Sequence, residues 1–277
     1  MTFAAPIRTL LAGAAMLTLA ACATPGARLA STAPAASPTA AAEGSAASGP
    51  VTIGIAAIND FHGNLEPPRQ AAMLPDGKGG TASVPAGGAA YLATAIREVR
   101  GRYANHLTIA AGDLMGSSPL ASALFLDEPA VEVMNRIGLD FNAVGNHEFD
   151  YGVPELLRKQ TGGCAKVAER QPCQLEPFRG AQFQFLAANT LNRADGSTLF
   201  PGTALRSFGT GARRVTVGLI GMTLKGTADL VNSKVNAAVT FRDEAETANS
   251  LIGDLKAQGA DAVIVVIHEG GRTSGDP

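Results

Sequence analysis

The chain has 277 residues, of which 46% are hydrophobic, so it can bury the core of one large domain. A formal net charge of −2 argues against a basic surface for duplex nucleic acid, and the absence of Trp argues against broad stacking surfaces for single strands. Any phosphate chemistry must therefore draw its positive charge from another source, and metal ions are the obvious one.

Residues 1–22 are typical of an export signal. Arg8 precedes an apolar run at 9–21 that is too short for a comfortable membrane span. The run closes with Leu-Ala-Ala-Cys at 19–22, which resembles a bacterial lipobox, whose cysteine becomes the lipidated first residue of the mature protein. We interpret Cys22 as a lipidation site, the alternative being an ordinary cleaved signal with a chance cysteine. This predicts an exported, lipid-anchored protein. It would lie on the periplasmic side of a bacterial membrane, with the outer membrane favoured, or at the cell surface.

Residues 23–50 consist mainly of Ala, Ser, Thr, Pro and Gly, with almost no large apolar side chains. Such a segment cannot bury enough surface to offset its ordering entropy. We expect a disordered tether that separates the membrane anchor from a folded part at 51–277.

From Val51 onward, segments typical of strands and helices alternate. Short apolar and β-branched runs predict strands at 51–60, 106–113, 141–146, 183–190, 213–222 and 260–271. Apolar residues at helical spacing predict helices at 87–103, 128–138 and 243–259. This alternation indicates an α/β architecture with buried sheets.

Cys164 and Cys173 lie close together in a polar, loop-like stretch. Export implies an oxidising compartment, so we expect a disulfide that closes this loop, with two free thiols as the alternative. No histidine or further cysteine stands nearby to complete a zinc site.

Four of the strand-like runs finish in acid, amide or imidazole groups next to glycine. Three of the four histidines of the chain fall in these clusters, and His106, at the start of a strand, is interpreted as a surface or structural residue. Oxygen and nitrogen donors without thiolate suit Mn, Zn, Fe, Ca or Mg. The candidate site residues are Asp60, His62, Asp113, Asn146, His147, Asp150 and His268.

The positions of these clusters in the predicted strands suggest how their side chains converge. In open α/β sheets, sites form beyond the carboxyl ends of the strands. In an extended chain alternate residues face one side, so Asp60 and His62 are expected to converge on one ion while Phe61 turns into the core. The acids Glu66, Glu148 and Glu269 are interpreted as supporting or solvent-facing groups.

Four blocks of the sequence resemble the calcineurin-like metallophosphoesterase superfamily, and more narrowly its secreted bacterial 5′-nucleotidase branch. The blocks are INDFHGNL, AGDLMGSSPL, NAVGNHEFDYG and ADAVIVVIHEGG. The resemblance covers nearly all of the chain after the tether. It implies a fold of two packed mixed β-sheets flanked by helices, in four layers.

The resemblance also implies a role for each site residue and a cofactor of two divalent metal ions such as Zn or Mn. Asp60 and His62 would bind the first metal, Asp113 would bridge both, and Asn146 and His268 would bind the second. A carboxylate has two oxygens with which to bridge, and a metal-activated hydroxide would attack the phosphorus.

His147 and Asp150 have a different role in the resembling family. His147 would face the substrate phosphate and Asp150 would orient its ring, so that a cationic imidazole stabilises the transition state or protonates the leaving group. Substitution of His147 should therefore damage turnover more than metal binding.

The family pattern continues with a Gly-His-x-His block and a separate substrate-binding domain, neither of which occurs before Pro277. On this basis each metal would lack one histidine ligand, and we expect this chain by itself to have weak or no activity. Base specificity is not readable, because the nucleoside-recognising aromatic residues of the family lie in the missing domain.

The leading functional hypothesis is a metal-dependent phosphomonoester hydrolase that releases phosphate from nucleoside 5′-monophosphates. A related phosphoesterase, such as a 2′,3′-cyclic nucleotide phosphodiesterase, a nucleotide-sugar hydrolase or a thiosulfate-handling relative, is the enzymatic alternative. A lipid-anchored binding module that has lost catalysis is the alternative from another class. A substrate panel separates the enzymes, and retention of bound metal separates them from an inert scaffold.

Overall fold

The computed structural model describes residues 49–69 and 71–270. The predicted signal at 1–22, the lipidation of Cys22 and all but the last two residues of the tether lie outside the described residues. Within the described ranges, no helix combines the length and the apolar character needed to cross a membrane.

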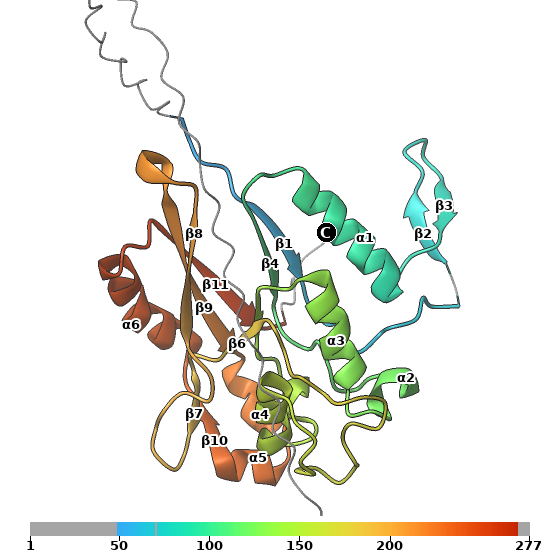
Figure 1. Ribbon diagram of the computed structural model, residues 1–277, viewed down its shortest axis with the longest axis vertical. Helices are drawn as coiled ribbons and strands as arrows, with labels where there is room; N and C mark the ends of the chain where they lie inside the picture. The colour runs from blue at the N-terminus through green and yellow to red at the C-terminus, as the bar shows by residue number, and fades with distance from the viewer. Residues whose placement is uncertain (1–48, 70, 271–277) are drawn as a thin grey trace, which may run out of the picture. The chain divides into compact units, whose positions relative to one another are not determined.

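Two β-sheets form the centre of the fold (Figure 1). The first has the order β1-β4-β5-β6 and contains only parallel pairs. The second has the order β11-β9-β8, in which β11 is parallel and β8 antiparallel to β9. Their strands are β1 (Gly54–Ile58), β4 (His106–Ala110), β5 (Phe141–Ala143), β6 (Gln184–Leu186), β8 (Thr203–Phe208), β9 (Val215–Thr223) and β11 (Ala262–His268).

Helices cover the outer faces of both sheets. In Figure 1, α1 (Gly88–Gly101) and α3 (Glu128–Ile137) lie on one side and α6 (Glu244–Ala257) on the other. One apolar cluster, which includes Leu107, Phe141 and Leu219, fills the space between the sheets. Two further clusters pack the helices against the outer faces. The predicted α/β fold of packed sheets flanked by helices is therefore confirmed.

Local sequence explains where the predicted elements begin and end. Strand β4 lies between β1 and β5, and all of its residues after His106 are buried, as expected for a central parallel strand. Helix α3 has Pro129 in its first turn and ends at Gly138, whose φ of 77° is a left-handed conformation that glycine adopts without strain. Helix α6 begins where the Asp243 side chain accepts a hydrogen bond from the Glu246 N–H.

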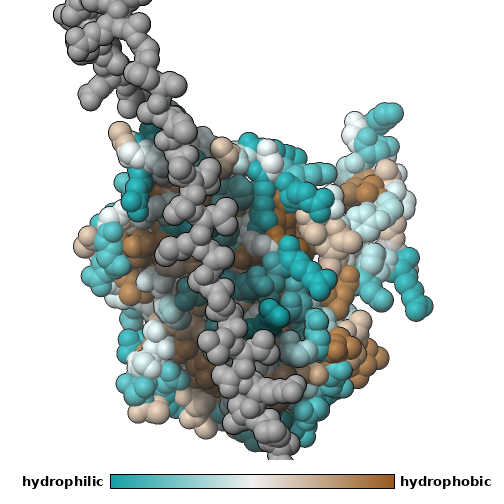
Figure 2. All heavy atoms as spheres, in the orientation of Figure 1, coloured by the Kyte–Doolittle hydropathy of each residue, from teal (hydrophilic) through white to brown (hydrophobic). Residues whose placement is uncertain are grey.

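Several smaller elements were not predicted. The hairpin of β2 (Ala72–Pro75) and β3 (Thr81–Val84) projects beyond α1 (Figure 1). Its exposed apolar side chains include Met73 and Leu74. Figure 2 shows brown, apolar surface on this projection. The other elements are short. They are α2 (Leu120–Ala123), α4 (Val153–Thr161), α5 (Ser233–Ala238), the paired strands β7 (Thr190–Asn192) and β10 (Val239–Phe241), and the 3-10 turns η1 (His147–Phe149), η2 (Gly211–Arg213) and η3 (Lys225–Asp229). Strand β8 was not predicted either, because it lies at the edge of its sheet and only its last residue is buried.

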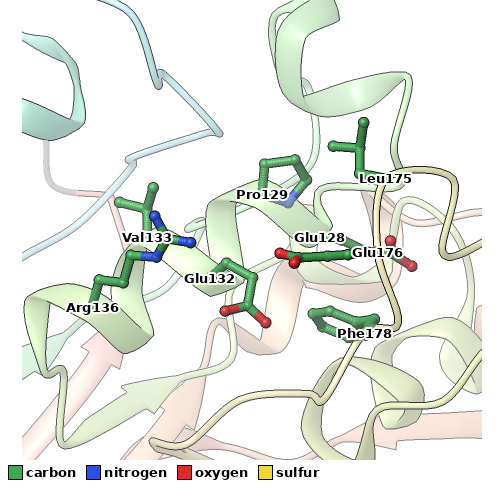
Figure 3. Close-up of a pocket in the computed structure, with 8 residues that line it drawn as sticks. All are labelled: Glu128, Pro129, Glu132, Val133, Arg136, Leu175, Glu176 and Phe178. Atoms are coloured by element: carbon green, nitrogen blue, oxygen red, sulfur yellow. The ribbon is translucent and has the colours of Figure 1, made fainter.

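The loop after α4 contains a disulfide between Cys164 and Cys173. A buried ionic network ties this loop to α3 and α4, because Glu128 accepts hydrogen bonds from the Cys173 N–H and from Arg158, and Arg158 also pairs with Glu155. The pocket in Figure 3, of about 170 Å³, lies at this junction between α3 and the loop segment that carries Phe178. None of the predicted site residues lines this pocket.

Candidate metal centre

The loops that follow β1 and β4 run side by side and extend the pairing of the two strands. Backbone hydrogen bonds continue past the strand ends, from the Asp60 N–H to the Gly112 carbonyl at 3.1 Å and from the His62 N–H to the Asp113 carbonyl at 2.9 Å. This pairing brings together the side chains of Asp60, His62 and Asp113. Their potential ligand atoms all lie within 4.8 Å of one another.

Asp60, His62 and Asp113 share an unusual backbone conformation. Their φ angles are 51°, 46° and 52°, in the left-handed region that non-glycine residues rarely adopt. The prediction of an extended Asp-x-His segment was therefore wrong, because β1 ends at Ile58 and both residues lie in the turn that follows. The predicted inward position of Phe61 is confirmed, since it is 8% exposed.

His268 reaches the same cluster from the second sheet. Its Nε2 lies 3.1 Å from Asp113 Oδ2, and its Nδ1 donates a hydrogen bond of 2.7 Å to the Ala111 carbonyl. The approach is close because residue 112 is glycine. A Cβ atom there would lie 2.8 Å from three atoms of His268, and Gly112 has a φ of 87°.

The electrostatics of Asp113 and His268 are those of a buried ion pair. Burial lowers the pKa of His268, but the hydrogen bond and the charge of Asp113 outweigh burial and raise this pKa above its ordinary value. Burial raises the pKa of Asp113, but the hydrogen bond from His268 outweighs it and lowers this pKa. A cation that bound here would have to displace the proton of His268.

His147 and Asp150 form a pair beside the cluster. His147 Nδ1 donates to Asp150 at 3.0 Å from Oδ2, and the His147 N–H donates to Asp113 Oδ1 at 2.9 Å. The His147 ring meets the His62 ring edge-on, with centroids 5.1 Å apart. Burial lowers the pKa of His147, but the hydrogen bond and charge of Asp150 outweigh it, so this pKa lies above the ordinary value.

The other residues singled out in the sequence occupy less central positions. Asn146 is partly buried and immediately precedes η1, next to the His147 N–H that binds Asp113. His106 is exposed at the opposite end of β4, as predicted. Glu66 and Glu269 are exposed.

Glu148, interpreted from the sequence as a supporting or solvent-facing acid, is a buried supporting group. Its carboxylate is buried, with a residue exposure of 3%. One oxygen accepts the N–H groups of Asp113 at 2.8 Å and Gly145 at 2.7 Å, and the other accepts the Leu114 N–H at 2.9 Å. Burial and the nearby Asp113 charge raise the pKa of Glu148 to about 7. Glu148 thus ties the loop after β4 to the loop after β5.

The donor set fits divalent cations. The Nδ1 atoms of His62 and His268 are both occupied by backbone carbonyls, so each ring leaves Nε2 free toward the carboxylates. Metal-binding histidines commonly have such a carbonyl partner on their second nitrogen. Asp60 is half exposed, whereas Asp113 is buried between His62 and His268.

Comparison with known proteins identifies the family. The family model described as calcineurin-like phosphoesterase matches residues 53–276. The chain belongs to this family. The resemblance inferred from the sequence blocks is therefore confirmed.

The relatives of this calcineurin-like phosphoesterase include an uncharacterized protein of Acinetobacter calcoaceticus, which is 48% identical over 57% of this chain and 79% of that protein. A 5′-nucleotidase of Vibrio vulnificus is 29% identical over 62% of this chain and 27% of its own length. Among solved structures, the NAD nucleotidase NadN of Haemophilus influenzae superposes with a TM-score of 0.58 and 26% identity, covering 77% of this chain and 34% of NadN. The chain thus spans about a third or less of the last two proteins.

Proposed function

We propose that this chain carries the metal-binding catalytic part of a phosphomonoesterase that acts on nucleoside 5′-monophosphates. The observation that carries the proposal is the convergence of donors from three strand ends: Asp60 and His62 after β1, Asp113 after β4, and His268 at the end of β11. Family membership and relatives named 5′-nucleotidase support the substrate class. A structural neighbour that acts as an NAD nucleotidase supports a nucleotide more generally.

In this proposal Asp60 and His62 would hold the first of two cations, Asn146 and His268 would hold the second, and Asp113 would contribute to both. When bound, such ions supply a polarised water as the nucleophile and neutralise the charge of the phosphoryl group. Zn or Mn suits the mixed carboxylate and imidazole donors. The buried position of Asp113 between the two histidines supports its bridging role.

His147 then has the task of moving a proton. Its Nδ1 is engaged by Asp150, so Nε2 is the atom that faces a substrate. The raised pKa keeps the ring protonated at neutral pH more often than a free imidazole. A protonated Nε2 can bind the phosphoryl oxygens and transfer its proton to the leaving alkoxide.

Export and lipid anchoring at Cys22 belong to the same proposal and are supported by the sequence alone. They fit a nucleotide hydrolase that meets its substrate outside the cytoplasm. Two measurements would test the lipid on Cys22. One is whether globomycin blocks processing of the precursor, and the other is whether mass spectrometry of the mature N-terminus finds a lipid on this cysteine.

The activity is tested with the purified protein, loaded with Mn²⁺, on AMP, UDP-glucose and 2′,3′-cyclic AMP. We expect AMP to be hydrolysed with the highest kcat/KM, and His147→Ala to lower kcat about 10²- to 10⁴-fold while Mn²⁺ affinity changes little. His106→Ala is the matched control, since that histidine is exposed and lies outside the site. Preferential hydrolysis of another substrate would refute the substrate class, and an unchanged kcat in His147→Ala would refute the role of His147.

A further inference from the structure

A buried carboxylate outside the ligand set binds the turn against which His62 rests. Asp127 immediately precedes α3 and has no exposed surface. Its Oδ2 accepts the Gly116 N–H at 3.0 Å. The carbonyl of Gly116 in turn accepts the hydrogen bond from His62 Nδ1 at 2.8 Å. Asp127 and His62 are thus joined through a single residue.

The turn at Gly116 and Ser117 is held by two such carboxylates. Both residues are left-handed, with φ angles of 78° and 48°, and a Cβ atom at position 116 would lie 2.2 Å from the His147 carbonyl. The Ser117 N–H is held by Asp150 Oδ2 at 2.8 Å. Two carboxylates therefore hold consecutive N–H groups, and the carbonyl between them faces the imidazole of His62.

Local stability does not explain why an acid occupies position 127. A residue at the start of a helix commonly caps the helix through its side chain, but the Asp127 side chain makes no capping bond to α3. Its Oδ1 has no hydrogen-bond partner among the described residues, although the atom is buried. Burial of a carboxylate with so few donors is costly. Among the described residues, the hydrogen bond from Gly116 is the interaction of the Asp127 side chain that offsets this cost.

We infer that Asp127 is a positioning residue for His62: by holding Gly116, it fixes the direction of the His62 imidazole and keeps the proton on Nδ1. The Nε2 atom then points at Asp60 and Asp113, which lie 3.5 and 3.7 Å away. The inference rests on the proposed role of His62 as a metal ligand and extends it to a residue that touches neither metal nor substrate. Loss of such an outer partner of a metal-binding histidine typically weakens metal affinity about 10- to 100-fold.

The test compares Asp127→Gly and Asp127→Asn by calorimetric titration of the purified chain with Mn²⁺ alone. Glycine suits the φ of 57° at this position but withdraws the acceptor, whereas asparagine retains an oxygen for Gly116. We expect Asp127→Gly to weaken Mn²⁺ binding about 10- to 100-fold and Asp127→Asn to stay within about threefold of the parent. The matched control is Asp140→Ala, which removes a carboxylate that accepts the Thr108 N–H at 2.8 Å in the middle of β4.

A second measurement separates positioning from loss of fold. The thermal midpoint of the metal-free Asp127→Gly protein should fall no further than that of Asp140→Ala, and its Mn²⁺ affinity should fall much further. If Asp127→Gly does not fold, Asp127→Ser makes the same comparison with a shorter side chain. Parental Mn²⁺ affinity in the folded glycine or serine variant would overturn the inference while leaving the metal site intact. If the parent binds no Mn²⁺ at all, the proposed metal site fails, and the inference fails with it.

Discussion

Replacement of Glu148 by glutamine tests whether the backbone around the site is organised by one carboxylate. The change keeps the size of the side chain and converts one oxygen into an N–H donor. Whichever oxygen is converted, two donors lose their acceptor: either the Asp113 and Gly145 N–H groups, or the Leu114 N–H and the Asn142 amide. Each orphaned buried donor costs about 1–3 kcal/mol, so the lost bonds cost about 2–6 kcal/mol.

Part of this loss of stability in Glu148→Gln is offset, by an amount that depends on pH. The pKa of Glu148 is raised from 4.5 to about 7, so the folded protein binds its proton more tightly than the unfolded chain does. The corresponding stability, about 3 kcal/mol, is fully present below pH 4.5 and is lost as pH rises through 7. Glutamine does not titrate and escapes this loss. Glu148→Gln should therefore destabilise the protein more at pH 5 than at pH 8, by about 2 kcal/mol.

The assay is urea unfolding of the metal-free protein, with EDTA present, at pH 5 and at pH 8. The matched control is Glu66→Gln, which changes an exposed acid close to the site in sequence and should leave the midpoint almost unchanged at both values. A Mn²⁺ titration of Glu148→Gln should also show weaker binding, because the Asp113 backbone loses its anchor. Equal destabilisation at the two pH values, or none at either, would refute the reasoning.

Two further predictions concern the residues around this centre. Asp150→Asn removes the charge that raises the pKa of His147, so the alkaline limb of the pH–rate profile, where the protonated ring is lost, should move to lower pH with little change in Mn²⁺ affinity. An alkaline limb that stays in place would show that His147 is not the group whose proton is lost. The double variant Cys164→Ser, Cys173→Ser removes a disulfide between cysteines that are 9 positions apart. Denaturant unfolding should show that the free energy of unfolding falls by about 2–3 kcal/mol, and the reduced parent protein is the control. Identical stability of the double variant and the oxidised parent would contradict this.

The sequence predicted those elements of the fold whose burial is simple. Strand β4 and helix α3 show clear apolar runs because one whole strand and one helix face are buried. Helix α4 shows no such pattern, since it buries the ionic network of Glu155, Arg158 and Lys159 beside only two apolar residues, Val153 and Leu156. Charged residues at these positions read as a solvated face in a single sequence.

The paired strands β7 and β10 escaped prediction for another reason. Strands β7 and β10 pair with each other over three residues each, which is too short for alternation to show. The β2–β3 hairpin was missed because its residues are exposed on both faces, so no apolar period marks it. Its exposed Met73 and Leu74 give no signal that distinguishes a strand from a loop.

The candidate site was predictable to the extent that it depends on side-chain chemistry and strand order. Carboxylates, amides and imidazoles at the ends of parallel strands were expected to converge, and Asp60, His62, Asp113 and His268 do so. What the sequence could not reveal is the work of the backbone. Three of the four hydrogen-bond partners of Glu148 are backbone N–H groups, which every residue except proline possesses and which carry no sequence signature.

Because side chains supply the ligands and backbone hydrogen bonds hold the loops, substitutions at the two kinds of position should have different effects. Three left-handed residues, Asp60, His62 and Asp113, cost about 1–3 kcal/mol each, and hydrogen bonds between the two loops offset that cost. Because those bonds join backbone atoms, they persist when a ligand side chain is replaced. Asp60→Asn should therefore lose metal and keep its fold, whereas loss of Glu148 or Asp127 should disturb the geometry in the metal-free protein as well. The conformation of the ligand-bearing loops is thus set by residues other than the ligands themselves. Those residues determine whether the ligands are positioned to bind a metal.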